Sequence, residues 1–207
     1  NGSPTCVMAY GQQDGAVGYL VGEANRGLEY MFVMMNAARL SVGLEGYAVA
    51  DRAFQQAASW ARTRVQGKPP GAPVGVTGPA PIIHHPDVKR MLLTMKSQIE
   101  AMRSLALYGA HQLDLGHGHA DEARRVAARA CGDLLIPVIK GCSTESGIDI
   151  CSLGIQVHGG MGFIEDTGAA QPYRDVRITA IYEGTTAIQA NDFVGRKLAR
   201  DRGAALA

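Results

Sequence analysis

Long stretches in which apolar residues recur every three or four positions alternate along the chain with short stretches rich in glycine and proline. The first long stretch runs from about residue 28 to residue 65 and has the spacing of a helix, beginning with Leu28, Met31, Phe32 and Met35. At 1.5 Å per residue such a helix reaches about 55 Å, with Gly43 and Gly46 as places where it could bend. Because this is long for a globular helix, the pattern predicts a large bundle.

Three more helices follow from the same periodicity. Residues 67–81 contain five of the nine prolines and therefore predict an irregular surface connection. A second helix is predicted to start near Pro86, with one apolar stripe made of Val88, Met91, Leu92, Met95, Ile99, Met102 and Ala106. A third is expected over residues 121–158, where Pro137 should kink or break it. The last is expected over 185–202, with a core-facing set of Ile188, Phe193, Val194 and Leu198.

The N-terminal segment has a different pattern. Residues 7–10 and 17–21 are short β-type apolar runs joined by Gly-Gln-Gln-Asp-Gly, a hairpin-like connector. Two short strands are not stable alone, so residues 1–27 are interpreted as the end of a truncated β-domain, and the missing initiator Met also indicates a piece of a longer protein. The predicted fold class is all-α: an antiparallel four-helix bundle over residues 28–207, with a short β remnant at the N-terminus.

Composition and charge exclude several classes of function. Lys and Arg number 20 against 19 Asp and Glu, so the net charge of +1 gives no signal for nucleic acid or an anionic membrane. No apolar run approaches the roughly 18 residues of a membrane span, and no secretory leader pattern opens the chain. The four cysteines lack zinc-finger or CxxC spacing, which favours a reduced, cytoplasmic setting.

One carboxylate stands out in the segment Ile-Tyr-Glu-Gly-Thr-Thr, residues 181–186. Glu183 follows an apolar run and precedes a glycine and two hydroxyl residues. It could be an acid favourable to a helix N-terminus, with a threonine as the cap, or a base in a pocket that contains little water. The local residues leave both interpretations open.

Two further segments contain residue types that could form a binding site. The segment Gln-Val-His-Gly-Gly-Met-Gly-Phe, residues 156–163, has glycines that could let a backbone approach a pyrophosphate, but taken alone it is more typical of a helix end, and it is not a Rossmann fingerprint. His117 and His119 lie in a glycine-containing turn without a third ligand at fixed spacing, so no metal site is predicted.

Taken together, three segments resemble one family. The stretch from "ARLSVGLEGYAVADRAFQQAASWARTRVQGKP" through "QVHGGMGFIEDTG" to "YRDVRITAIYEGTTAIQ" is similar, in order and separation, to the C-terminal half of an acyl-CoA dehydrogenase, especially the larger bacterial ones. The likeness extends over residues 22–202. It implies an FAD enzyme that oxidises an acyl-CoA thioester to the trans-2-enoyl-CoA, with a glutamate that removes the α-proton.

The resemblance also implies roles for individual residues. Glu183, in "IYEG", matches the catalytic base, and Arg39 matches an arginine placed near it. Matches to FAD-contacting positions are Arg64, Gln156, Gly160 and Thr185, and Gly184 matches a contact to substrate. Several of these contacts cross between subunits in the family, so a homodimer or homotetramer is implied, and an electron-transfer flavoprotein is the expected electron acceptor.

Two departures and one gap limit the likeness. Residues 64–67 are one residue shorter than the family pattern and lack its Phe, and Ala187 stands where many members have a glutamine. Because the family holds its flavin against a middle β-domain, we expect the 207-residue chain to fold as a bundle that binds FAD poorly and turns over little alone.

Two alternative functions are compatible with the same fold. One is a non-catalytic flavoprotein acting in a DNA-damage response, which would require a clustered basic face that the near-neutral chain does not indicate. The other is an acyl-CoA oxidase, which shares the base but lets oxygen reach the reduced flavin.

Overall fold

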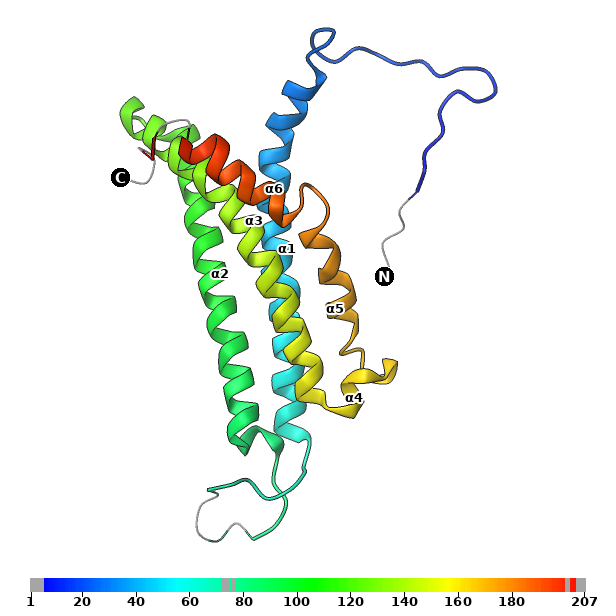
Figure 1. Ribbon diagram of the computed structural model, residues 1–207, viewed down its shortest axis with the longest axis vertical. Helices are drawn as coiled ribbons and strands as arrows, with labels where there is room; N and C mark the ends of the chain where they lie inside the picture. The colour runs from blue at the N-terminus through cyan, green and yellow to red at the C-terminus, as the bar shows by residue number, and fades with distance from the viewer. Residues whose placement is uncertain (1–5, 72–74, 76, 200–201, 204–207) are drawn as a thin grey trace.

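Three long antiparallel helices form the body of the protein (Figure 1). The computed structural model describes residues 6–71, 75, 77–199 and 202–203. The long helices are α1 (Gly27–Thr63), α2 (Pro86–Gly118) and α3 (Glu122–His158). Short elements follow, and their bounds are α4 (Gly160–Phe163), η2 (Glu165–Thr167), α5 (Gln171–Val176), η3 (Arg177–Ala180), α6 (Thr186–Asn191) and η4 (Asp192–Leu198), with η1 (Ile82–His84) just before α2.

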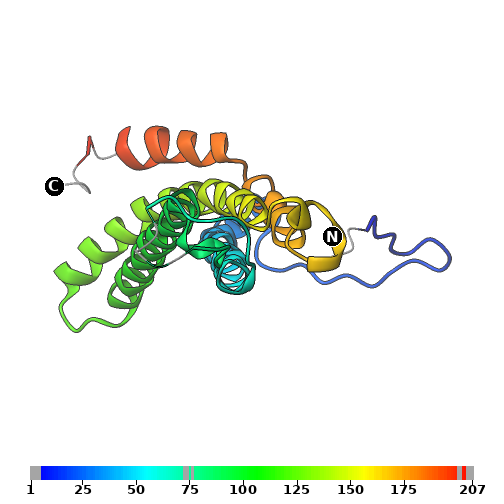
Figure 2. The ribbon, with the colours of Figure 1, turned by 90° about the horizontal axis from the view of Figure 1, so that it is seen from below.

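The C-terminal segment supplies the fourth helix of the bundle. Helix α6 continues directly into η4, a π-helical stretch, and this segment lies as a separate layer against α3, as Figure 2 shows. The predicted all-α four-helix bundle is therefore confirmed. The last helix ends near residue 199, and residues 200–201 of the predicted range lie outside the described part of the chain.

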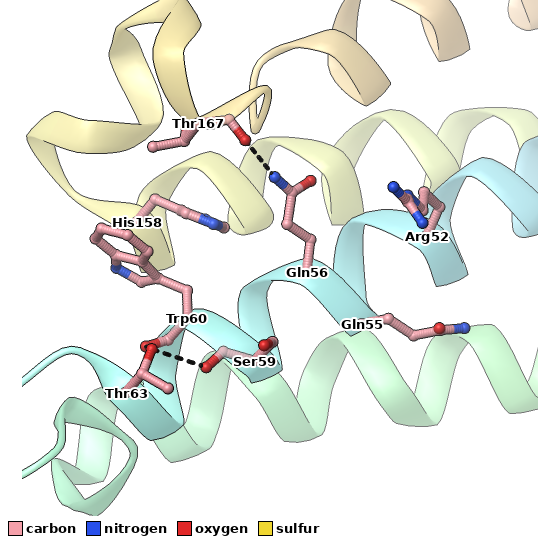
Figure 3. Close-up of a pocket in the computed structure, with 8 residues that line it drawn as sticks. All are labelled: Arg52, Gln55, Gln56, Ser59, Trp60, Thr63, His158 and Thr167. Atoms are coloured by element: carbon pink, nitrogen blue, oxygen red, sulfur yellow. Dashed lines mark hydrogen bonds between the residues drawn. The ribbon is translucent and has the colours of Figure 1, made fainter.

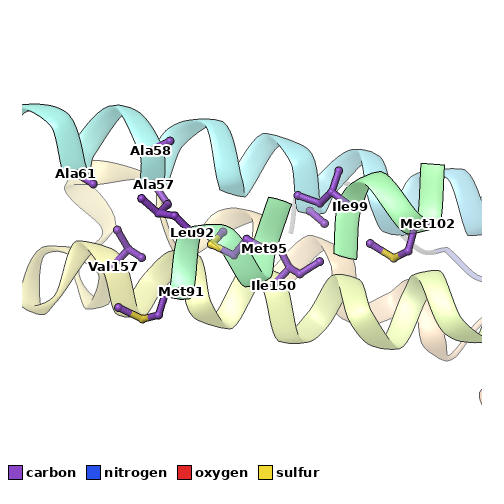
Figure 4. Close-up of a cluster of buried hydrophobic side chains, with 11 residues drawn as sticks. Ala57, Ala58, Ala61, Met91, Leu92, Met95, Ile99, Met102, Ile150 and Val157 are labelled. Carbon is purple, nitrogen blue, oxygen red and sulfur yellow. The ribbon is translucent and has the colours of Figure 1, made fainter. Parts of the chain in front are cut away.

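The core between α1, α2 and α3 follows the predicted stripe. Helix α2 buries Met91, Met95, Ile99 and Met102 against small residues of α1 and against Ile150 of α3 (Figure 4). Alanines on α1 let the helices approach closely while the methionine side chains fill the irregular space between them. Apolar burial is worth about 25 cal/mol per Å², so this shared stripe is the main force that holds the three helices together.

Helices α1 and α3 pack closely against each other at Gly46. A Cβ atom added at Gly46 would lie 2.6 Å from the backbone oxygen of Ser143, which leaves no room for a side chain. Helix α1 continues unbroken through Gly43 and Gly46, so these residues serve contact with α3 rather than a break. Pro137 likewise lies within α3 without ending that helix.

The short β remnant predicted at the N-terminus does not form in the described residues. The described residues 6–26 contain no strand and are almost entirely exposed, although a turn does form over residues 11–14. A strand requires a neighbouring strand to satisfy its backbone groups, and this part of the chain provides no partner. The connection predicted over 67–81 is irregular where it is described, with one isolated β-bridge between Val65 and Pro81.

The apolar face predicted for the last helix is also wrong in part. Ile188 is 43% exposed and Val194 is 60% exposed, whereas the polar residues Gln189 and Asp192 are buried. The cause is their polar partners, because Asp192 pairs with the buried Arg39 of α1 and Gln189 donates to the carbonyl oxygen of Gly184. No helix in the described part of the chain is long and apolar enough to cross a membrane.

Candidate functional site

The turn between η3 and α6 carries Glu183 and has an unusual backbone. Glu183 has φ of 54° and Gly184 has φ of 91°, so two consecutive residues adopt the left-handed region. That region disfavours a residue with a Cβ atom by about 1–2 kcal/mol. Residues in such strained conformations persist only where surrounding contacts hold them, and they cluster at functional sites.

Two side chains hold the turn from below. The carbonyl oxygen of Gly184 accepts a hydrogen bond from Lys140 Nζ at 2.6 Å and another from Gln189 Nε2 at 3.0 Å. Gln189 Nε2 also lies 3.5 Å from the carbonyl oxygen of Glu183. Both lone pairs of the Gly184 oxygen are thereby used, so the turn is fixed to α3 and to α6.

Two glutamates from the long helices hold the residues on either side. The Tyr182 hydroxyl donates to Glu45 of α1, and the Thr186 hydroxyl donates to Glu145 of α3. Burial raises the pKa of Tyr182, and its bond to Glu45 raises that pKa further, so this hydroxyl stays protonated as a donor. Thr185 caps α6 by accepting from the backbone N–H of Ile188 at 3.4 Å.

The carboxylate of Glu183 has no bonding partner among the described residues. It is half-buried, and among the described residues its carboxylate makes no hydrogen bond or ion pair, unlike Glu45 and Glu145 beside it. The acid lies just ahead of Thr185, the N-cap of α6. Its backbone is held by a hydrogen bond, whereas its carboxylate is not.

Arg39 lies beneath the same turn but has another partner. Its Nη1 atom donates to Asp192 Oδ2 at 2.8 Å, and both side chains are only 4% exposed. A Cβ atom added to Gly184 would lie 3.6 Å from Arg39 Nη2, so the guanidinium reaches the turn without bonding to Glu183. Arg196, more exposed, contacts the other oxygen of Asp192 at 3.0 Å.

The other predicted site residues lie at the opposite end of the bundle. Arg64 is the C-cap of α1, Gln156 is exposed near the end of α3, and Gly160 opens α4. Since Arg39 and Arg64 are 25 positions apart along α1, about 37 Å separates them at 1.5 Å per residue. The structure therefore divides the predicted residues into two sites, with Glu183, Gly184, Thr185 and Arg39 in one and Arg64, Gln156 and Gly160 in the other.

A cleft of about 460 Å³ opens near this second group (Figure 3). Its end is formed by the rings of Trp60 and His158, which stack with centroids 5.1 Å apart. Gln56 donates to the carbonyl oxygen of Thr167 at 2.6 Å and so joins α1 to the segment after α4. The Arg64 guanidinium lies 6.0 Å from the centroid of the Trp60 ring. Of the residues that line the cleft, His158 alone belongs to a segment that the sequence marked as a candidate site.

No other part of the described chain packs against Gly160 at the position of a Cβ atom. A Cβ atom added there would meet nothing within 4 Å, so packing within this chain does not require glycine. An exposed guanidinium, an exposed amide and an uncovered backbone are the kinds of donor that suit a phosphate group. No group of three or more metal-ligating side chains lies together among the residues that the structure describes.

Comparison with known proteins identifies this architecture. The family model described as "Acyl-CoA dehydrogenase, C-terminal domain" matches residues 25–198. The chain belongs to the acyl-CoA dehydrogenase family. Its likeness to 3-methylmercaptopropionyl-CoA dehydrogenase of Ruegeria pomeroyi is 54% identity over 205 residues, covering 97% of this chain and 33% of that protein.

Two other relatives of this acyl-CoA dehydrogenase chain span the same region. The broad-specificity linear acyl-CoA dehydrogenase FadE5 of Mycobacterium tuberculosis is 40% identical over 210 residues, covering 99% of the chain and 34% of the relative. The crystal structure of Caenorhabditis elegans ACDH-11 in complex with C11-CoA matches with a TM-score of 0.75 and 25% identity, covering 88% of this chain and 28% of that one. The chain thus spans about a third of the length of these relatives.

Sequence reasoning missed the residues that hold the turn, namely Lys140, Gln189, Asp192, Glu45 and Glu145. One signal was present for Lys140, which interrupts the apolar run Leu-Leu-Ile-Pro-Val-Ile over residues 134–139. Asp192 had none, because its partner Arg39 is 153 positions away.

A substitution at Gly184 tests the geometry of the turn. In Gly184→Ala, the new Cβ atom would lie 2.8 Å from Gln189 Nε2 in a left-handed backbone, so we expect a loss of about 1–3 kcal/mol in the free energy of unfolding. Urea denaturation measures this loss. Gly195→Ala on η4 is the matched control, since its Cβ atom meets nothing within 4 Å, and equal effects of the two substitutions would contradict the description of the turn.

Proposed function

We propose that this chain supplies the catalytic base and part of the flavin site of an FAD-dependent acyl-CoA dehydrogenase that oxidises an acyl-CoA thioester to the trans-2-enoyl-CoA. The single observation that carries the proposal is the Glu183 carboxylate, which is half-buried and without a hydrogen bond or ion pair on a strained turn, while the neighbouring carboxylates are engaged. A carboxylate of this kind can accept the α-proton of the thioester.

The groups around Glu183 take supporting roles in the proposal. Its carboxylate oxygen receives and holds the α-proton, and the buried guanidinium of Arg39 makes the surrounding potential more positive. Gly184 leaves room beside the base because it has no side chain, which suits close approach of the substrate. Thr185 is exposed at the start of α6, where we place a contact to flavin.

The second group of residues fits FAD by its chemistry. Arg64, Gln156 and the open backbone at Gly160 would hold the diphosphate portion, and they lie at the opposite end of the bundle from Glu183. When bound, FAD supplies the acceptor for the hydride that leaves the β-carbon. Because the two groups are about 37 Å apart along α1, we assign Arg64, Gln156 and Gly160 to the flavin of a neighbouring subunit, in a homodimer or homotetramer.

The rest of the proposed enzyme follows from the family likeness. We propose that residues 1–27 are the end of a middle β-domain, that residues 28–207 are the C-terminal bundle, and that an electron-transfer flavoprotein reoxidises the flavin of a cytoplasmic enzyme. The names of the relatives favour a dehydrogenase over a nucleic-acid-binding flavoprotein. Hydrogen peroxide formed during turnover would instead support the oxidase.

The direct test uses the full-length protein that carries this chain. Under anaerobic conditions, its flavin absorbance is expected to bleach when a short-, medium- or long-chain acyl-CoA is added, with enoyl-CoA appearing in equal amount. The 207-residue chain alone is expected to be colourless, since most of the flavin site would be missing. Full-length protein that contains flavin but does not bleach with any of these thioesters would contradict the proposed function.

A further inference from the structure

Lys140 is buried without a carboxylate partner. It is the largest fully buried side chain of the described residues, with 0% exposure, and it lies in α3 between Ile139 and Gly141. Taking an ammonium group out of water is costly, and buried lysines are usually paired with an acid. Here no carboxylate in the described part of the chain lies within ion-pair distance, and the hydrogen bond of Lys140 goes to the carbonyl oxygen of Gly184 at 2.6 Å.

The charged groups around Lys140 shift its pKa in opposite directions. Burial lowers the pKa of Lys140, and the neighbouring cation Arg39 lowers it further. Glu145 and Glu183 act in the opposite direction and favour the charged form. Arg39 is in turn bonded to Asp192 of η4, and Glu145 accepts from Thr186. Arg39 and Glu145 thus have partners of their own, and the hydrogen bond that Lys140 makes goes to the turn that carries Glu183.

Lys140 bonds to the backbone at the strained left-handed turn. Glu183 and Gly184 form the left-handed turn, and the Gly184 oxygen is the acceptor shared by Lys140 and Gln189. A charged donor makes a shorter and stronger hydrogen bond than a neutral one. Lys140 therefore supplies the shorter and stronger of the two bonds, and it joins the turn to α3, whereas the Gln189 amide joins it to α6.

We propose that Lys140 is a positioning residue for the base: its side chain binds the Gly184 carbonyl and fixes the turn that presents Glu183. The proposal rests on the assignment of Glu183 as the base. It predicts that loss of the Lys140 hydrogen bond loosens the turn and lowers kcat while the KM for acyl-CoA changes little.

Two substitutions test this role in the full-length holoenzyme. Lys140→Met keeps a long apolar side chain but removes the donor, whereas Lys140→Gln keeps an N–H donor that is neutral and one atom shorter. Lys89→Met, at an exposed lysine of α2, is the matched control. The readouts are kcat and KM, and hydrogen exchange of the backbone amides of residues 181–188.

For Lys140→Met we expect kcat to fall about 10- to 100-fold, because a base displaced by about 1 Å loses this much. The KM for acyl-CoA and the FAD content should change little. Hydrogen exchange should become faster over residues 181–188 while the α1–α3 core stays protected. Lys140→Gln, whose shorter and neutral side chain makes a weaker bond, should show the same changes in kcat and amide exchange to a smaller extent.

Several results would overturn the proposal. A Lys140→Met enzyme with unchanged kcat and amide exchange would do so, and so would one that is less stable but has a normal kcat per folded molecule. If Lys140→Met does not fold, Lys140→Gln decides the matter, because unchanged kcat and amide exchange in that variant would overturn the proposal. Full turnover in Glu183→Gln, with faster exchange of the turn in Lys140→Met, would remove the proposed function but keep the clamp. Lost turnover in Glu183→Gln with no effect of Lys140→Met would remove the clamp alone.

Discussion

Replacing Glu183 with Gln in the full-length enzyme is expected to lower kcat for acyl-CoA oxidation by about 10²–10⁴-fold, the usual contribution of a positioned general base. Gln has nearly the same shape, and the turn is held through backbone carbonyls rather than through the Glu183 side chain. The variant should therefore keep its fold, its FAD and its affinity for acyl-CoA. Steady-state kinetics with flavin quantification and a binding titration measure these quantities.

Glu45→Gln is the control for that experiment. Glu45 is a neighbouring carboxylate that accepts a hydrogen bond from Tyr182, and the amide oxygen of Gln can still accept it. We expect its kcat to remain within about tenfold of the wild-type value, as loss of one charge-assisted hydrogen bond allows. Equal losses in the two variants would mean that neither carboxylate acts specifically as the base.

The largest expected effect on stability comes from the buried pair of Arg39 and Asp192. Replacing Asp192 with Ala leaves the Arg39 guanidinium buried without its counterion, and Arg39 Nε already has no hydrogen-bond partner in the described structure. Breaking one partner of a buried ion pair costs about 3–5 kcal/mol. We expect a loss of that size in the free energy of unfolding, measured by urea denaturation, together with a lower midpoint for the segment that contains α6.

Two comparisons isolate the cause of that loss. Asp87→Ala removes an acid that pairs with Arg90 on the exposed face of α2, where such a pair contributes about 0–1 kcal/mol. The double variant Arg39→Met with Asp192→Leu removes both charges and should recover much of the stability, because apolar replacements of buried pairs are often neutral. An Asp192→Ala protein as stable as Asp87→Ala would contradict the account of a buried pair.

How far the sequence predicted this fold depends on how local each feature is. The spacing of Met91, Met95, Ile99 and Met102 places these residues on one face of α2, and that face is buried. Pro86 stands at the start of α2, where its missing N–H costs nothing. Periodicity and helix-start signals depend on residues a few positions apart, so they could be identified without the structure.

The features that failed depend on distant partners. Residues 7–10 and 17–21 have strand-like composition, but no neighbouring strand is available to either in the described chain. Ile188 and Val194 have the spacing of a core face, yet Gln189 and Asp192 are buried in their place because their partners come from the turn and from α1. Likewise, a lysine inside an apolar run gives no sign that its acceptor is a carbonyl oxygen 44 positions away.

The most direct test of the central claim, that Glu183 removes the α-proton, is an isotope exchange measurement on the full-length enzyme. An acyl-CoA whose β-carbon carries no hydrogen cannot lose a hydride, so exchange of its α-hydrogens with deuterated water, followed by mass spectrometry, reports the base alone. If Glu183 is the base, we expect rapid exchange with the wild-type enzyme and exchange that is slower by about 10²–10⁴-fold with Glu183→Gln. Exchange by the Glu183→Gln enzyme at the wild-type rate would show that another group abstracts the proton.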